Sequence, residues 1–397
     1  MNLRFLALIL FALPAAAGPA PDESARRIAI RKSVAFLDEH LFALPETAGT
    51  PRKPFTYAVA GLVYLMNEPR TGRDSPIPRI KDYLLDYLEE VERRSRDPEE
   101  LPRQQGVATS WSLIQYTWPM AVSGLFFAEL HQRGQYRKES SAALRRIVAV
   151  LQEAQQANGG WGHGRVNPQE GPDPRNPLAD RMAGFKATYP DTLVSSSFCA
   201  AATIGIAGAI LGRDTVPCAP DAREYFRTAQ LPYGNFPYDP SQRSSGQSVT
   251  SVGRTAGAVY AMHCLGMQRD RRFDRAVEYV LSSLPKIPEG HGSPCLNMMY
   301  GALACHALGP KTFERFKKEF HPRLIAAQGE TGELACICEG SGFGVTCDTK
   351  TPISIGLFQR GQKVYTTALH AFVLLLDSRR LKILDKSLPR AATTRRR

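Results

Sequence analysis

The sequence predicts an all-α fold in which about six helical hairpins close into a double ring, an α/α toroid of inner and outer helices. Three observations lead to this prediction. Two kinds of helical segment alternate along the chain, one kind carries small apolar residues on nearly every side, and a glutamine–glycine spacing recurs where helices of the other kind end. The composition agrees, because 43% hydrophobic and 22% charged residues in a chain of 397 are typical of a globular protein.

The helical segments alternate strictly. Those of the first kind are amphipathic, with an apolar stripe and a charged face, which is typical of a helix with one solvated side. Those of the second kind are apolar nearly all the way round, as expected for helices with neighbours on every side. We expect amphipathic helices near residues 26–41, 78–94, 139–156, 221–229, 271–284 and 311–328, and apolar helices near 56–66, 115–131, 192–211, 253–266, 294–308 and 364–377.

Closure into a ring explains the small residues better than an open solenoid does. Six hairpins in series fit either architecture. In a solenoid the second helix of each pair would usually keep a polar face, whereas the inner helices of a closed ring touch both the outer ring and one another. The runs Cys-Ala-Ala-Ala-Thr at 199–203 and Thr-Ala-Gly-Ala at 255–258 suit that inner position, and we predict closure.

One spacing recurs at the ends of three amphipathic segments: a glutamine, three residues, a glycine, one residue and an apolar side chain. A glycine can take the left-handed backbone that a helix end requires. The glutamine amide can bond the exposed backbone of an adjacent turn. The three copies run from Gln155 through Gly159 to Trp161, from Gln230 through Gly234 to Phe236, and from Gln328 through Gly332 to Leu334.

This pattern resembles the QW repeat of squalene–hopene and oxidosqualene cyclases and the related repeat of prenyltransferase β subunits. The resemblance spans about residues 26–377 and implies the toroid of the terpenoid cyclase and protein prenyltransferase superfamily, of which this chain looks like a divergent member. The first, second and fifth hairpins lack the full pattern; Leu41 and Pro285, for example, stand where the glutamine would be.

The two ends of the chain lie outside the predicted ring. Residues 1–17 read as a signal peptide, with Arg4, an apolar run over 5–13 and three alanines before Gly18, so we expect an exported protein, periplasmic or secreted. Residues 378–397 form a basic tail, which we expect to be solvated. With a formal net charge of +12, the chain could contact an anionic surface peripherally through this tail. We expect no nucleic-acid partner.

In a ring of this topology every outer-to-inner connection emerges at one end, so the inner-helix N-termini converge there. Their partial positive charges favour an anion or a polar ligand head. Two long connections, 162–191 and 335–363, belong to that end, and long connections are often functional. We therefore expect any site to lie under them, facing the central cavity.

Four residues at inner-helix starts are candidate ligand-binding residues. Trp118 and Tyr365 could line an apolar or sugar-binding cavity, or could only pack. Arg254 could bind an anion or pair with a carboxylate such as Asp191. Asp191 itself could face the ligand or cap the helix that follows.

The resemblance also indicates which chemistry to look for. Class II cyclases use an aspartic acid two positions before a threonine at the start of an inner helix, and here Pro190 holds that position before Thr192. Prenyltransferases hold zinc partly with a histidine that follows a tyrosine, whereas here Thr366 follows Tyr365 and His370 lies about one turn further along. We therefore expect no class II acid, no bound metal and no cofactor.

The cysteines leave one alternative open. Cys199, Cys264 and Cys305 fall in apolar helical runs and are expected to be buried thiols. Cys336, Cys338 and Cys347 cluster in one connection, where a disulfide, free thiols, or a zinc site completed by a distant histidine would all fit.

Two classes of function follow. We expect a protein that binds a small-molecule or peptide ligand, apolar or isoprenoid-like, in the cavity of the ring. The alternative is an enzyme, either a divergent isoprenoid cyclase or transferase or a carbohydrate-active enzyme on the same toroid. A fold does not choose between them.

Overall fold

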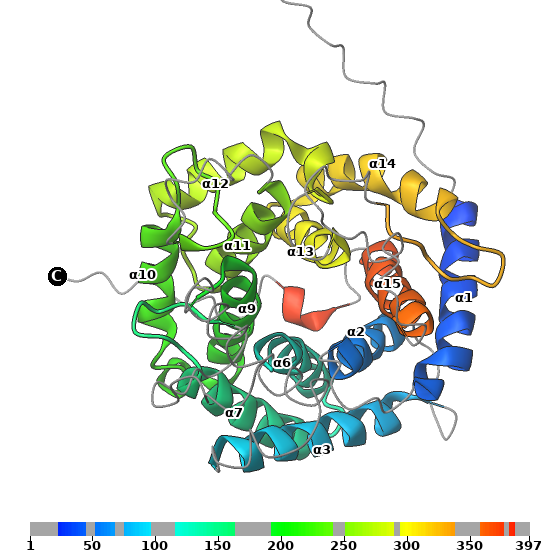
Figure 1. Cartoon of the computed structure of the whole chain (residues 1–397), viewed down its shortest axis with the longest axis horizontal. Helices are drawn as coiled ribbons and strands as arrows, with labels where there is room; N and C mark the ends of the chain where they lie inside the picture. The colour runs from blue at the N-terminus through cyan, green and yellow to red at the C-terminus, as the bar shows by residue number, and fades with distance from the viewer. Residues whose placement is uncertain are drawn as a thin grey trace, which may run out of the picture.

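The computed structural model describes residues 23–44, 52–67, 75–96, 116–162, 192–240, 251–289, 294–337, 358–376 and 381–385. Within these ranges the chain forms twelve α-helices in two concentric rings (Figure 1), and the only strand-like pairing is two isolated β-bridges. The all-α toroid predicted from the sequence is therefore confirmed. The predicted signal peptide, residues 1–17, and most of the predicted tail lie outside the described ranges.

Each expected helix is present, within a few residues of its expected bounds. The inner ring consists of α2 (Arg52–Met66), α6 (Thr117–Gln132), α9 (Val194–Leu211), α11 (Val252–Cys264), α13 (Pro294–Ala307) and α15 (Phe358–Leu375). The outer ring consists of α1 (Glu23–His40), α3 (Ile77–Arg96), α7 (Arg137–Glu153), α10 (Ala219–Ala229), α12 (Arg271–Ser282) and α14 (Pro310–Ala326).

The inner ring is closed. Each inner helix packs against two inner neighbours in the order α2, α6, α9, α11, α13 and α15, and α15 packs against α2 again. In the outer ring the last helix, α14, meets the first, α1. The open solenoid, the alternative architecture, is therefore wrong for this chain.

Small residues let the inner helices approach one another closely, as the sequence predicts. A Cβ added at Gly124 of α6 would lie 2.3 Å from Cγ2 of Thr203 on α9, and the Thr203 hydroxyl donates a hydrogen bond to the Ala121 carbonyl at 2.7 Å. Helix α9 is long and apolar enough to cross a membrane, but 72% of it is buried inside the ring. Its apolar surface is explained by neighbours on every side.

The three glutamine–glycine segments occupy equivalent places, each joining the end of one outer helix to the next outer helix. In every copy the glutamine Nε2 donates to the carbonyl of its own glycine and to a backbone carbonyl of the following outer helix or its cap. The bonds run from Gln155 to Gly159 (2.9 Å) and Cys218 (3.1 Å), from Gln230 to Gly234 (3.0 Å) and Arg272 (2.7 Å), and from Gln328 to Gly332 (3.3 Å) and Ala29 (2.8 Å).

The third copy closes the outer ring. Gln328 lies after α14, the last outer helix, and its acceptor Ala29 belongs to α1, the first. Ser33 of α1 donates its hydroxyl to the Gly332 carbonyl at 3.2 Å and accepts from Gln328 Nε2 at 2.9 Å. The same local motif that links successive outer helices therefore also links the two ends of the ring.

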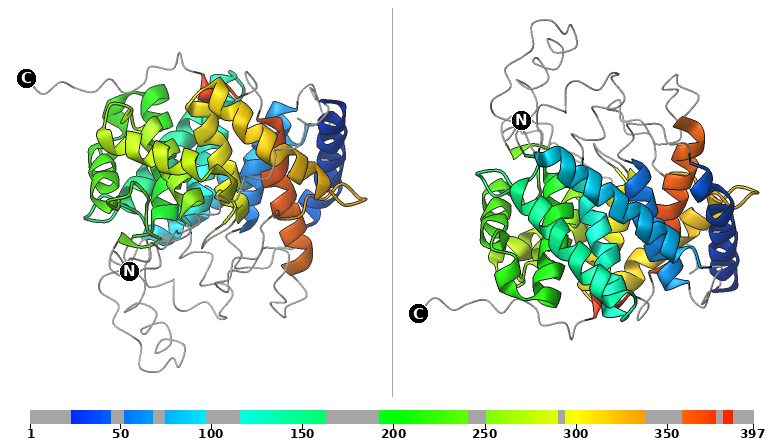
Figure 2. Two further views of the ribbon diagram at one scale, coloured as in Figure 1. Left: turned by 90° about the horizontal axis from the view of Figure 1, so that it is seen from above. Right: turned by 90° about the horizontal axis from the view of Figure 1, so that it is seen from below.

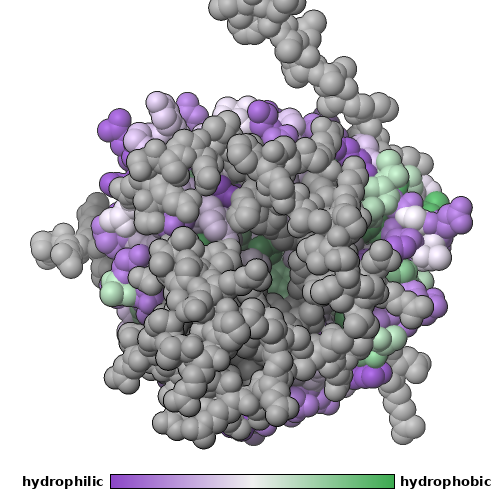
Figure 3. Space-filling view, viewed as in Figure 1, coloured by the Kyte–Doolittle hydropathy of each residue, from purple (hydrophilic) through white to green (hydrophobic). Residues whose placement is uncertain are grey.

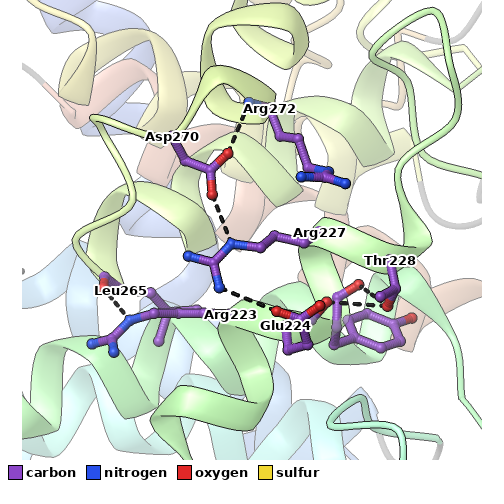
Figure 4. Close-up of polar contacts among 8 residues, drawn as sticks. Arg223, Glu224, Arg227, Thr228, Leu265, Asp270 and Arg272 are labelled. Atoms are coloured by element: carbon purple, nitrogen blue, oxygen red, sulfur yellow. Dashed lines mark hydrogen bonds and ion pairs between the residues drawn. The ribbon is translucent and has the colours of Figure 1, made fainter. Parts of the chain in front are cut away.

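The joint between α10 and α12 adds an ion-pair network (Figure 4). Arg227 of α10 donates to the carboxylate of Asp270 at 2.8 Å, and Asp270 caps α12 by accepting from the backbone N–H of Arg272 at 2.9 Å. Partial burial opposes ionisation of Asp270, but these two hydrogen bonds outweigh it and hold its pKa below the ordinary value. Arg223 donates to the Leu265 carbonyl at 2.9 Å and ties the same helix to the end of the α11 region.

Part of the predicted tail belongs to the fold. Residues Leu381–Asp385 pack at the centre of the ring, where Lys382–Leu384 form the 3-10 helix η6 (Figures 1 and 2). Leu381 and Ile383 are buried members of the hydrophobic core. The boundary at residue 377 was therefore placed too early, because two aliphatic side chains within the basic stretch find an apolar environment inside the ring.

Candidate functional site

Three inner helices, α9, α11 and α15, are held to the ends of outer helices by one repeated hydrogen bond. The backbone N–H of the apolar residue in each glutamine–glycine segment donates to a hydroxyl in the following inner helix. The bonds run from Trp161 to Ser197 (2.8 Å), from Phe236 to Thr255 (3.1 Å) and from Leu334 to Thr367 (2.9 Å). We call this end of the ring, where the inner helices begin, the mouth.

Trp118 lies at the mouth as the second residue of α6. It is half-buried, and its indole Nε1 donates to the hydroxyl of Ser196 in the first turn of α9 at 2.5 Å. The ring therefore bridges two neighbouring inner helices. Packing and this hydrogen bond account for much of its position.

Arg254 lies in the first turn of α11 and is only 3% exposed. Its guanidinium carbon lies 5.7 Å from the centre of the Tyr238 ring, within the range of a cation–π interaction. Burial lowers the pKa of Arg254 to about 10, against the opposing influence of Tyr238 and Tyr279. A cation is therefore held in a poorly solvated place at the mouth, where an anion would be attracted strongly.

Tyr365 lies in α15 on another side of the ring. It is buried, and its ring centre is 5.7 Å from that of Phe55 on α2. Trp118, Arg254 and Tyr365 thus stand on α6, α11 and α15, which are alternate members of the six-membered inner ring. The structure places the three at one end of the ring but on separate sides of it.

Asp191, the fourth candidate, lies outside the described residues, so its role stays a prediction. Helix α9 begins at Val194, and its N-cap is Leu193. Leu193 has an extended backbone because its N–H donates to the Trp161 carbonyl at 2.9 Å. The bond to the preceding segment therefore delays the helix start by two residues relative to the expected position at 192.

Three buried polar atoms near the inner-helix starts have no hydrogen-bond partner among the residues that the structure describes. They are the hydroxyl oxygens of Thr117 on α6 and Ser195 on α9 and the amide nitrogen of Asn297 on α13. The Asn297 side chain lies against Gly253, the residue before Arg254. Buried polar groups are almost always bonded, so each of these atoms is available to a water molecule or a ligand. Sequence reasoning missed them, although a polar residue in the first turn of an otherwise apolar helix was a usable signal.

Sequence reasoning also missed Asp239, which is buried and follows Tyr238 in the connection from α10 to α11. The Tyr238 carbonyl accepts the backbone N–H of Val194 at 3.2 Å, so this connection sits on the start of α9. Tyr238 is therefore followed in the sequence by the buried Asp239, and its ring contacts the buried guanidinium of Arg254. The signal in the sequence was the Tyr-Asp-Pro run two residues after Phe236.

Aromatic rings fill part of the lumen below the mouth. Phe198 of α9 lies 4.7 Å from Tyr300 of α13, and Tyr300 lies 6.0 Å from Tyr260 of α11, as measured between ring centres. A Cβ at Gly257 would lie 2.6 Å from the Phe198 ring, so the contact passes directly over the backbone of α11. Figure 3 shows hydrophobic side chains in the central hollow of the ring. Phe198, Tyr260 and Tyr300 are themselves buried and belong to the hydrophobic core of the ring.

The cysteines within the described residues are not arranged to bind a metal. Burial raises the pKa of Cys199 and of Cys305 to about 12, which agrees with the expected buried thiols, whereas Cys264 is half-buried. Among the residues the structure describes, no group of three or more His, Cys, Asp or Glu side chains could hold a metal ion. Cys338 and Cys347 lie outside those residues, so the pairing of the cysteine cluster stays a prediction.

His370 is buried in α15, and burial lowers its pKa to about 4, against a hydrogen bond with the Ala335 backbone that raises it. A histidine whose pKa is depressed in the folded protein stabilises the fold above pH 6.5, and this contribution is lost as the pH falls towards 4. We expect the free energy of unfolding to fall by on the order of 3 kcal/mol over this interval. In His370→Gln, urea unfolding at a series of pH values should show a flatter profile, whereas the profile of His131→Gln should match that of the unaltered protein.

Comparison with known proteins identifies similar chain arrangements at low sequence identity. The type II terpene cyclase MstE from Scytonema, without ligand, aligns with a TM-score of 0.47 and 14% identity over 89% of this chain and 98% of the cyclase. A variant of that cyclase in complex with its product, merosterolic acid A, aligns with a TM-score of 0.46 and 13% identity over 88% and 96%.

A possible member of the GH105 family from Salmonella enterica serovar Paratyphi A aligns with a TM-score of 0.33 and 13% identity, over 91% of this chain and 98% of that protein. No protein-family model matches the sequence. No curated protein sequence matches it either. The function of this chain therefore has to be argued from its own residues.

Proposed function

We propose that this chain is an exported binding protein that holds a ligand in the mouth of the toroid, a ligand with an apolar body and an anionic or polar head. The observation that carries the proposal is the set of buried polar atoms without partners at the inner-helix starts, those of Thr117, Ser195 and Asn297. They lie at the same end of the ring as the buried guanidinium of Arg254. Donors held in a dry site favour an anion strongly.

The apolar part of the ligand has a matching wall. Trp118 is half-buried at the mouth and offers an aromatic surface, and the residues around it in the core, such as Phe198, are apolar. Sites for small molecules are mostly apolar, with a few polar groups that fix the orientation of the ligand. An isoprenoid chain with a diphosphate head has this chemistry and serves as the probe.

Two finer proposals rest on the sequence. The three glutamine–glycine segments are proposed to be divergent QW-type repeats, because all three make the same pair of glutamine bonds and the same bond to an inner-helix hydroxyl. Export is proposed from residues 1–17, whose basic start, apolar run and small residues fit a cleaved signal.

The test is binding of geranylgeranyl diphosphate and of geranylgeraniol, which share the apolar chain and differ in the head group. Arg254→Met should weaken binding of the diphosphate by about 10- to 100-fold, the value of a hydrogen bond to a charged group, and leave binding of the alcohol unchanged. Isothermal titration calorimetry measures both. A circular dichroism spectrum identical to that of the unaltered protein shows that the Arg254→Met variant is folded.

Arg145→Met removes an exposed arginine of α7 and is the matched control, which should not alter either affinity. Equal affinity of Arg254→Met and the unaltered protein for the diphosphate would refute the role of Arg254. Conversion of the bound diphosphate into a new product would favour the alternative, an isoprenoid cyclase or transferase. Binding of oligosaccharides in place of both probes would favour a carbohydrate-active protein.

A further inference from the structure

The segment Leu381–Asp385 lies at the end of the ring opposite the mouth, where the inner helices finish (Figure 2). Its side chains at 381 and 383 are 4% and 6% exposed, although the segment contains only one 3-10 turn. Such a turn has no stability of its own in water. The ring therefore imposes the conformation of the segment, as a receptor does with a bound peptide.

A buried carboxylate contacts the backbone of this segment. Glu129, in the last turn of α6, is 0% exposed, and its two oxygens accept the backbone N–H groups of Lys382 at 3.1 Å and Ile383 at 2.9 Å. Arg133 donates to the same carboxylate at 2.6 Å. These contacts use the main chain of the segment, so they select an extended or turn-forming peptide without selecting the side chain at position 382.

The position of Glu129 is unfavourable for α6 taken alone. A carboxylate near the C-terminus of a helix meets the negative end of the helix dipole. A buried carboxylate also costs several kcal/mol unless it is paired and hydrogen-bonded. Arg133 and the two backbone N–H groups of the segment offset these costs. The most direct reason for an acidic residue at this place is recognition of the segment.

The segment does not fill its seat completely. A small pocket remains between Ile383, Leu384 and Asp385 and the ends of three inner helices. This pocket is partly open to the surface, so it lies beside the segment rather than beneath it. The helix residues that line the pocket include Ile206 of α9, Tyr260, His263 and Cys264 of α11, and His306 of α13.

We propose that the end of the ring opposite the mouth is a peptide-binding site. The segment Leu381–Asp385 occupies this site as a tethered, exchangeable ligand. The site takes a peptide with aliphatic residues at the positions of Leu381 and Ile383. The carboxylate of Glu129 accepts the backbone N–H groups at positions 382 and 383 of that peptide. The bound segment closes the lumen from below, so the ring is a cup with one open end. Displacement of the segment by a similar peptide in trans opens the second end.

The test uses the full chain, in which the recognition sequence of a specific protease replaces residues 377–380. Cleavage of the folded protein makes the C-terminal piece a separate peptide without removing any contact of Glu129. A fluorescein-labelled synthetic peptide of residues 381–389 is then added, and fluorescence anisotropy follows its binding. We expect saturable binding to the cleaved protein and at least tenfold weaker binding to the uncleaved protein, in which the tethered segment competes.

Two variants assign the site. Glu129→Gln should weaken peptide binding at least tenfold, whereas Glu153→Gln, which alters an exposed carboxylate of α7, should not. A labelled peptide with Ile383→Ser should also bind at least tenfold more weakly. Loss of helical circular dichroism on cleavage, absence of exchange over a day with a hundredfold excess of peptide, or equal affinity of Glu129→Gln and the unaltered protein would each overturn the proposal.

Discussion

Gly332→Ala is expected to lower the free energy of unfolding by about 3–5 kcal/mol, the sum of backbone strain and steric overlap. Gly332 has a φ of +98°, where an L side chain is strained, at a cost of about 1–3 kcal/mol. A Cβ at this position would also lie 2.3 Å from the Lys32 carbonyl oxygen of α1. That oxygen belongs to a helix backbone and cannot move by itself, so the outer ring would have to open between α14 and α1.

Gly212→Ala is the matched control for this prediction. Gly212 has a φ of +102°, close to that of Gly332, but nothing lies within 4 Å of an added Cβ. This variant should therefore lose only the strain of about 1–3 kcal/mol. Urea unfolding followed by circular dichroism gives both values. If the two variants are destabilised equally, the close approach of Gly332 to α1 does not contribute to closure of the ring.

Trp161→Ala is expected to lower the free energy of unfolding by about 4–6 kcal/mol, near the upper end for loss of a large buried side chain. The indole is fully buried, and its Nε1 donates to the Leu151 carbonyl of α7 at 2.6 Å. The substitution leaves a cavity between the rings and a buried carbonyl without its donor, and these two costs add. The same unfolding measurement checks the value.

Trp161→Phe separates the two contributions. A phenylalanine already occupies the equivalent place in the second copy, at Phe236, where it is also fully buried. The aromatic ring should therefore fit, and only the hydrogen bond to Leu151 and part of the volume are lost, at a cost of about 1–2 kcal/mol. A Phe variant as unstable as the Ala variant would contradict the equivalence of the copies.

The three copies also show why the sequence predicted the joints so well. The glutamine, the glycine and the apolar residue lie within seven positions of one another, and each glutamine reaches the next outer helix or its cap. The local spacing of these residues therefore determines most of the geometry of the three glutamine–glycine segments. The aromatic ring is the part that varies, since Leu334 replaces it in the third copy and is fully buried there as well.

The candidate site was predicted less completely. Trp118 and Arg254 lie in the first turns of α6 and α11, as the alternation of helices predicts, whereas Tyr365 is the eighth residue of α15, which begins earlier than expected. Their separation onto alternate inner helices depends on the order of the ring, which the sequence supplied, but the buried atoms of Ser195 and Asn297 depend on neighbours far away in the chain. No local pattern distinguishes a bonded hydroxyl from one without a partner.

The sequence by itself determined the helical class, the number and order of the hairpins and the position of the three glutamine joints, because hydrophobic periodicity and turn chemistry act over a few residues. Only the tertiary structure decided that Gln328 reaches α1, across 299 positions of the chain, and that Glu129 holds a segment 253 positions away. Such contacts form between surfaces that become neighbours when the ring closes. A charged residue at position 129 and two aliphatic residues in a basic tail acquire their roles only from that closure.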